Sequence, residues 1–300
     1  MTQVKTKKIG LIGLGSMGKP MAINLLKANF PLTVYDIREE PLVEVKKLGA
    51  KVAKNAKEVG AESDTVIVMV LNYLHMQEAV LPPAGVLSGM KRDSTLIVTS
   101  TIAPSEVEAV EKVARESGVT VIDAPVSGGR IGAEEGSLTI MIGGNDKAIH
   151  ENEAIFRTLG KNIYHVGKVG QGQVMKMINQ ILYTANLVTL AEALVIAKKF
   201  NMDLKQVLDV QSNGSADSRV LRTCGPRILA RDFEPKGAVD VLTKDTRIIM
   251  NTGLELDIPL PVSSLSYQLY RIAASRGLGR EDGAAVIKVF EDYAGVTVSD

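Results

Sequence analysis

Short apolar runs alternate with amphipathic stretches along the first half of the chain. The apolar runs are rich in β-branched residues and short enough to be buried strands, while residues 17–28 and 105–117 carry helical patterns. The predicted strands lie at residues 8–13, 32–36, 65–70, 96–100, 120–123 and 138–142. Because apolar strands separated by helices form parallel sheets covered on both faces, we predict an α/β, doubly wound parallel sheet for this half.

The pattern changes after about residue 167. A single helical pattern without Pro or Gly runs from residue 173 to 200, and it is apolar around most of its circumference, as a buried helix is. Further helical patterns follow at residues 204–211, 218–228, 239–253, 263–276 and 281–293. We therefore predict an α/β domain over residues 1–166 and an all-α domain over residues 167–300, joined by the long central helix.

Composition excludes several classes of function. The 300 residues carry 35 basic and 34 acidic side chains, so no basic field attracts nucleic acid or an anionic membrane. Tryptophan is absent, and one cysteine allows no internal disulfide. We expect no stretch long enough to cross a bilayer. The apolar run after the basic first residues is broken by glycines, whereas the apolar core of a secretion signal is continuous. We expect a cytoplasmic protein without nucleic-acid or membrane partners.

A glycine motif follows the first predicted strand and opens the first predicted helix. Gly13, Gly15 and Gly18 form G-x-G-x-x-G, in which the glycines allow a tight turn, close approach of a pyrophosphate, and packing of helix on strand. The free N–H groups of a helix start favour such an anion. We predict a Rossmann-type dinucleotide site whose loop contacts come from Gly13, Leu14, Gly15, Ser16, Met17 and Gly18.

Asp36 ends the second predicted strand, where a carboxylate is expected to hold the adenosine ribose hydroxyls. The same charge repels a 2′-phosphate, which favours NAD over NADP. Arg38 keeps NADP open, because a guanidinium two residues later can pair with that phosphate.

Three further motifs follow the glycine loop in order. They are Asp-Ala-Pro-Val-Ser-Gly-Gly at residues 123–129, Gly-Gln-Gly-Gln-Val-Met-Lys-Met-Ile-Asn at residues 170–179, and Lys-Asp at residues 244–245. With these four blocks, essentially the whole chain resembles the β-hydroxyacid dehydrogenase family, which includes 3-hydroxyisobutyrate dehydrogenase, tartronate semialdehyde reductase and L-threonate dehydrogenase. The resemblance implies hydride transfer between a small 3-hydroxy carboxylic acid and NAD(P).

The third block carries the expected chemistry. Lys176 and Asn179 are three residues apart and share one face of the long helix, and apolar residues flank the lysine. A lysine in a desolvated site can take the hydroxyl proton of an alcohol or return it to a carbonyl oxygen. The resemblance implies that Lys176 is the catalytic acid and base and that Asn179 positions the substrate.

The remaining site residues lie in loops and on a later helix. The resemblance implies that Ser127, Gly128 and Gly129 hold the substrate, in a loop at the carboxyl edge of the sheet, and that Lys244 reaches the nicotinamide end. Leu71, Asn72 and Thr101 follow two strands at that same edge, where the family places cofactor contacts.

Several alternatives stay open. A catalytically silent NAD(P)-binding module on the same fold is the second reading, against which the retained Lys176 argues. No metal is expected, because His75, His150, His165 and Cys224 lie far apart in sequence. Arg130 either selects a second polar group of the substrate or is a solvated side chain. The choice among hydroxy acids is open, and a homodimer or homotetramer is expected.

Overall fold

The computed structural model describes residues 7–81 and 83–299. The chain forms two compact units, Met1–Lys176 and Met177–Asp300. The predicted domain boundary after residue 166 lies near the end of the last strand of the first unit, and the two domains remain a prediction.

The first unit is built on one parallel-dominated sheet, in which the described residues form nine strands. The strand order is β3-β2-β1-β4-β5-β6-β8-β7, and β9 pairs with β8. The first six strands are mutually parallel, β8 is antiparallel to β6 and β7, and β9 is parallel to β8. The strands are β1 (Ile9–Ile12), β2 (Leu32–Tyr35), β3 (Lys51–Val52), β4 (Thr65–Val68), β5 (Thr95–Val98), β6 (Thr120–Asp123), β7 (Val126–Ser127), β8 (Leu138–Gly143) and β9 (Gly160–Gly167).

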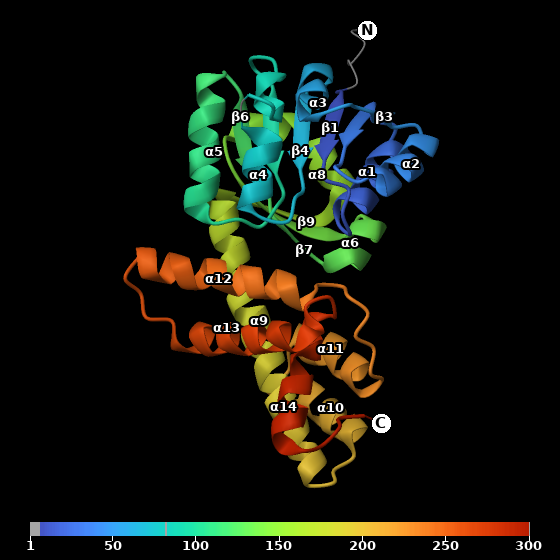
Figure 1. Ribbon diagram of the computed structural model, residues 1–300, viewed down its shortest axis with the longest axis vertical. Coiled ribbons are helices and arrows are strands. Elements are labelled where there is room, and N and C mark those ends of the chain that lie inside the picture. Colours follow the sequence, from blue (N-terminus) through green and yellow to red (C-terminus); the bar gives the residue numbers. More distant parts are fainter. Residues whose placement is uncertain (1–6, 82, 300) are drawn as a thin grey trace. The chain divides into compact units, whose positions relative to one another are not determined.

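Helices cover both faces of this sheet (Figure 1). Successive strand residues point to opposite faces, so Ile67 packs in the cluster that contains α1 and α8, whereas Val66 and Val68 pack in the cluster that contains α3, α4 and α5. This two-sided burial explains why the strands are apolar runs without alternation. The helices are α1 (Gly18–Lys27), α2 (Glu39–Lys47), α3 (Ala56–Glu62), α4 (Tyr73–Val80), α5 (Pro104–Glu116), α6 (Gly129–Glu135), α7 (Asp146–Glu151) and α8 (Glu153–Leu159), with a short 3-10 turn at Val86–Ser88.

The predicted α/β, doubly wound fold is confirmed, and the strand order changes direction between β1 and β4. Each of the six predicted strands exists, with ends displaced by one or two residues. Three strands were not predicted. β3 and β7 have two residues each, and β9 is mostly exposed or half-buried, so it lacks the apolar run that marks the others.

The second unit is all-helical in the described residues, as predicted, and its core gathers around the later half of α9 (Gln171–Lys199), where Leu187, Ala191 and Leu194 are fully buried. The predicted helix at 281–293 is partly wrong. The α-helix begins only at Ile287, because the Asp282 carboxylate accepts from the Ala284 N–H and starts a 3-10 turn there. The other α-helices are α10 (Leu204–Ser212), α11 (Arg219–Leu229), α12 (Val239–Glu255), α13 (Pro261–Ala273) and α14 (Ile287–Ala294), with a π-helical turn at Ala274–Leu278 and the 3-10 turn at Gly283–Val286.

Helix α9 corrects one expectation. It is 29 residues long and apolar enough to cross a membrane by length and composition, so the prediction that no stretch has that length is wrong. Half of its most apolar window is buried inside the protein, which is typical of a core helix.

Candidate active site

The glycine loop joins β1 to α1 at the carboxyl edge of the sheet. Gly13 has φ +92°, and a Cβ there would collide with the backbone oxygen of Met69. A Cβ on Gly18 would collide with the Gly13 carbonyl, whereas Gly15 has no heavy atom within 4 Å of the place where a Cβ would lie. The first and third glycines therefore allow close packing, and the second leaves open space that suits the approach of a pyrophosphate.

The start of α1 is suited to an anion. Its N-cap, Met17, makes no side-chain capping bond, and Ser16 is exposed beside it. The first N–H groups of a helix have no partner within the helix, and they carry the positive end of its dipole. In α1 the Lys19 N–H donates to the Gly15 carbonyl at 3.1 Å and Pro20 has no N–H, so an anion would use the N–H groups of Met17 and Gly18. These residues fit a dinucleotide phosphate.

Asp36 lies directly after β2 and is only 8% exposed. Its Oδ2 accepts from the Leu14 N–H at 2.6 Å, which ties the end of β2 to the glycine loop. Arg38 donates to the same carboxylate from its backbone N–H, Nε and Nη2 at 2.9, 3.1 and 3.2 Å. Burial raises the pKa of Asp36, but the hydrogen bonds from Arg38 and Leu14 outweigh it and lower the pKa below its usual value. The carboxylate is therefore ionised, and four donors already surround it.

The loops after β4 and β5 contain the other predicted cofactor residues of this unit. The Asn72 side-chain oxygen accepts from the His75 N–H at 3.0 Å and so caps α4. Leu71 is exposed and Thr101 is half-buried. Ser100, which is 1% exposed, accepts from the Val70 N–H at 2.7 Å and joins the two loops. Asn72 has thus a structural task beside the predicted one.

The predicted substrate loop turns sharply between β7 and α6. Gly128 and Gly129 have φ values of +133° and +61°, a backbone conformation that other residues rarely adopt. Ser127 is half-buried at the end of β7. Arg130 pairs with Glu134 at 2.8 Å, and both side chains are about half exposed. Arg130 is therefore held by a residue of its own helix.

Lys176 lies in the second turn of α9 and is 8% exposed, so the predicted buried environment is present. The first turn is held by two buried polar side chains, Asp123 and Gln173, which were not among the predicted site residues. Asp123 accepts from the Gly170 and Gln173 N–H groups at 2.9 and 2.8 Å. Asp123 is the first residue of the second motif, which is the signal that could have found it.

A chain of polar contacts links two helices of the second unit. The Asn179 Nδ2 donates to Gln180 at 2.8 Å, and the Gln180 Nε2 donates to Asp245 at 2.5 Å. The other oxygen of Asp245 pairs with the Lys244 Nζ at 2.9 Å. The structure thus connects the predicted Asn179 with the predicted Lys244. Gln180 was missed, although it is 6% exposed and its spacing of four places it on the same helix face as Lys176.

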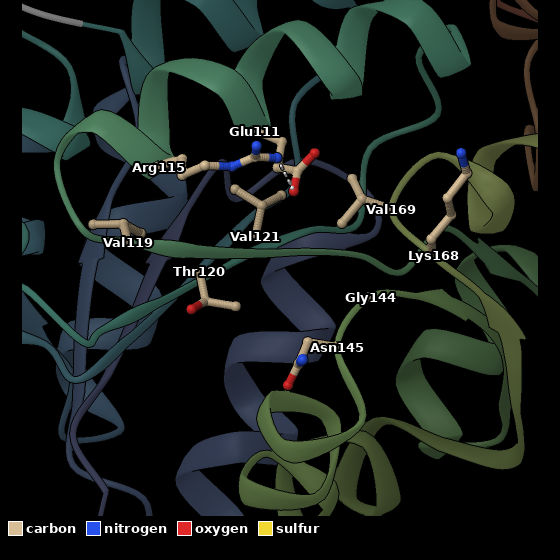
Figure 2. A pocket seen from close by; sticks show the side chains of 9 residues that line it. All are labelled: Glu111, Arg115, Val119, Thr120, Val121, Gly144, Asn145, Lys168 and Val169. Carbon is tan, nitrogen blue, oxygen red and sulfur yellow. Dashed lines mark hydrogen bonds and ion pairs between the residues drawn. The ribbon is translucent and has the colours of Figure 1, made fainter.

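A cavity of about 360 Å³ opens beside the end of α5 and the start of β6 (Figure 2). No residue predicted to contact cofactor or substrate lines it, and its Arg115 is paired with Glu111 at 2.8 Å. Among residues 7–81 and 83–299, no group of three or more His, Cys, Asp or Glu side chains is placed to hold a metal ion. The cavity is therefore not the candidate site.

Two family models together match nearly the whole chain. The NAD binding domain of 6-phosphogluconate dehydrogenase matches residues 8–167, which include the glycine loop. The NAD-binding domain of NADP-dependent 3-hydroxyisobutyrate dehydrogenase matches residues 170–290, which include Lys176 and Lys244.

Curated proteins and solved structures agree with these models. The chain is 38% identical to 2-(hydroxymethyl)glutarate dehydrogenase of Eubacterium barkeri over 98% of both chains. It is 35% identical to 2-hydroxy-3-oxopropionate reductase of Escherichia coli over 95% of this chain and 97% of that one. A structure of Mycobacterium tuberculosis 3-hydroxyisobutyrate dehydrogenase with L-serine superposes with a TM-score of 0.88, at 26% identity, over 95% of this chain and 99% of that one.

These relatives are named as dehydrogenases and reductases, which supports an active enzyme and not the silent module. The glycine loop, the buried lysine and the order of the four motifs agree with that assignment. The chain therefore belongs to the β-hydroxyacid dehydrogenase family and is an NAD(P)-dependent dehydrogenase.

Proposed function

We propose that this enzyme interconverts a 3-hydroxy carboxylic acid and the corresponding aldehyde or ketone acid, with Lys176 as the proton-transfer group. The observation that carries the proposal is a lysine only 8% exposed in the second turn of α9. Burial disfavours the charged form of a lysine, which is what a general base for an alcohol needs.

The bound nicotinamide supplies the hydride acceptor in oxidation and the donor in reduction. Lys176 Nζ accepts the hydroxyl proton as the alcohol is oxidised. In the reverse direction the ammonium stabilises the negative charge that develops on the carbonyl oxygen and then gives it the proton. Asn179, three residues on along the same helix, orients the substrate.

The loop of Ser127, Gly128 and Gly129 is proposed to hold the carboxylate of the substrate. Its positive φ values are consistent with exposed backbone N–H groups, and Ser127 adds a hydroxyl donor. 3-Hydroxyisobutyrate, glycerate and L-threonate all have a carboxylate and a hydroxyl on the third carbon. 2-(Hydroxymethyl)glutarate, which names one relative, has the same unit with a second carboxylate. Arg130 is the proposed partner of such an extra group.

We propose NAD as the preferred cofactor because the ionised Asp36 repels a 2′-phosphate. The hydrogen bonds from Arg38 must rearrange before the ribose can use Asp36, and a guanidinium released in this way can pair with the phosphate of NADP. The roles of Leu71, Asn72, Thr101 and Lys244 at the cofactor, a homo-oligomeric state and a cytoplasmic location belong to the same proposal.

Absorbance of the reduced nicotinamide tests the proposal with NAD or NADP and a panel of 3-hydroxy acids, with 2-hydroxy acids as the contrast. We expect turnover with 3-hydroxy acids and a fall of about 100- to 10,000-fold in kcat for Lys176→Ala, the scale of an acid–base group. The matched control is Lys147→Ala, which removes an exposed lysine of the same unit. Retained turnover in Lys176→Ala, with NAD binding intact, would contradict the assigned role.

A further inference from the structure

The first turn of α9 is capped by a carboxylate that comes from elsewhere in the chain. The start of the helix has N–H groups without partners inside it. Asp123, the last residue of β6, accepts from two of these groups, the Gly170 N–H to Oδ1 at 2.9 Å and the Gln173 N–H to Oδ2 at 2.8 Å. Asp123 is fully buried. A strand of the sheet thus fixes where the helix starts.

The same turn is held a second time through a side chain of its own. Gln173, 1% exposed, donates from Nε2 to the Ser100 carbonyl at 2.9 Å and accepts from the Ile102 N–H at 3.2 Å. Both partners lie just beyond the end of β5, next to β6 in the sheet. Two neighbouring strand ends therefore position one helical turn.

The backbone around Asp123 leaves room for its carboxylate and for little else. A Cβ on Gly143 would collide with Asp123 Oδ1 and lie 2.9 Å from the Gly172 N, and a Cβ on Gly172 would lie 2.7 Å from Asp123 Oδ2. A glycine on β8 and a glycine in the first turn of α9 thus enclose the carboxylate, and a longer acid or a shifted helix would not fit.

We propose that Asp123 and Gln173 are positioning residues that fix the first turn of α9 and thereby hold Lys176, three residues after Gln173, in its reactive place. The inference rests on the proposed role of Lys176. Residues three apart lie on one helix face, so a rotation or slip of the first turn moves the lysine directly. A displacement of about 1 Å can lower a rate about 100-fold.

The hydrogen bonds at the site suit an ionised carboxylate better than an amide, although burial opposes the charge. Both oxygens of the anion accept, whereas a protonated acid or an asparagine would turn a donor toward one of the two N–H groups. Burial raises the pKa of Asp123 to about 6, against the opposing effect of the backbone hydrogen bonds. The group therefore changes form within an accessible pH range, and Asp123→Asn resembles its protonated form at every pH.

Other ionisable groups surround the site and must be controlled. Glu108 of α5 lies 3.1 Å from the place of a Cβ on Gly170, and Lys168 precedes the helix with an exposed side chain. His165 of β9 contacts the Gly167 carbonyl at 2.9 Å and Asp146 at 3.1 Å. His165→Gln is the control that removes this side chain from the comparison.

The first test compares Asp123→Asn with Asn55→Ala, which removes the side-chain cap of α3 in the same unit but far from α9 in sequence. We expect Asp123→Asn to speed hydrogen exchange at residues 171–176 and to lower kcat about 10- to 100-fold, with an unchanged Kd for NADH. Asn55→Ala should change neither. Normal exchange, or faster exchange with an unchanged kcat, would overturn the proposal.

The second test is the pH profile of kcat in the reductive direction. In that direction Lys176 acts in its protonated form, so a low pH does not remove the active form of the lysine. We expect kcat to decrease below about pH 6 in the wild type and in His165→Gln. In Asp123→Asn this decrease, the acidic limb of the profile, should be absent. An identical limb in Asp123→Asn would overturn the proposal. Failure of the lysine assignment would appear separately, as an active Lys176→Ala enzyme.

Gln173→Met gives an independent check, because methionine fills a similar volume without the two hydrogen bonds. We expect the same faster exchange at residues 171–176 and a lower kcat with unchanged NADH binding. Since both side chains hold one turn, the double variant with Asp123→Asn should lose less than the product of the two single losses. Independent, multiplicative losses would show that the two residues do not act on one position.

Discussion

Asp36 and Asp123 occupy equivalent places at the carboxyl ends of two parallel strands, β2 and β6, and both are buried. Their surroundings differ in one respect. Asp36 faces the Arg38 guanidinium, and its pKa lies below the usual value. Asp123 faces backbone N–H groups, and burial raises its pKa to about 6. A full opposite charge compensates for desolvation, whereas neutral donors compensate for it only in part.

The difference teaches what each carboxylate is suited to do. Asp36 is ionised throughout the physiological range and acts as a fixed charge beside the glycine loop. Asp123 keeps its charge at neutral pH at the expense of stability, which suggests that its two acceptor oxygens are needed where they are. Sites that reduce stability in this way are commonly functional.

The largest expected effect is on the pH dependence of stability. The folded pKa of Asp123 is raised, so its contribution is most favourable below pH 3.8 and is lost as the pH rises through about 6. We expect the unfolding free energy of the wild type, relative to Asp123→Asn, to fall by about 3 kcal/mol over that interval. Urea unfolding at several pH values measures it, and a constant difference would contradict it.

Asp36→Asn should show the opposite sign. The folded pKa of Asp36 is lowered, so its stabilising contribution is present above pH 3.8 and is lost as the pH falls through the folded value. We expect a smaller effect than at Asp123, measured by the same urea series. A stability difference that shrinks with rising pH would break the comparison between the two aspartates.

Arg38→Ala removes the cation that distinguishes the two sites. Asp36 then becomes available to the ribose hydroxyls, and a partner for the 2′-phosphate is lost. We expect kcat/KM to shift toward NAD and away from NADP by about tenfold, the effect of one charge-assisted hydrogen bond of about 1.4 kcal/mol. Arg157→Ala, at an exposed ion pair on α8, is the matched control. An unchanged ratio would remove Arg38 from cofactor selection.

The smallest expected effect concerns Asn72, which caps the helix that directly follows it, whereas Asp123 caps a helix distant in sequence. Asn72→Ala removes the side-chain bond at the start of α4 and should lower stability by about 1 kcal/mol. Thermal unfolding measures the loss. If Asn72 also contacts the cofactor, as predicted, the Kd for NAD rises more than it does in Asn55→Ala. Equal Kd values in the two variants would leave Asn72 only its structural role.

Sequence patterns predicted the first unit well for two reasons. Its strands are buried on both sides, and the spacing of its glycines marks positions where a side chain would not fit. Gly13 and Gly18 are the clearest examples. Strand β9 was not predicted because it is largely exposed and lacks an apolar run, and it is a strand only through its pairing with β8. The cofactor and substrate assignments remain predictions, to be tested by the variants above.

The polar contacts that hold α9 could not be predicted from local sequence patterns, for a different reason. Asp123 and Gln173 are 50 residues apart, and no periodicity connects the end of a strand with the start of a helix. Gln180 and Asp245 are 65 residues apart and meet only because two helices of the second unit pack together. Long-range polar pairs of this kind depend on tertiary structure, which single-sequence patterns do not contain.

The outer strands of the sheet have a consequence for handling the protein. β3, at one end of the strand order, has only two residues and begins with the exposed Lys51. β9 pairs with β8 through two register irregularities and carries the exposed Lys161. Short, charged or bulged edges are poor templates for the addition of a foreign strand. Concentrated solutions should therefore resist amyloid-like aggregation nucleated from the folded sheet.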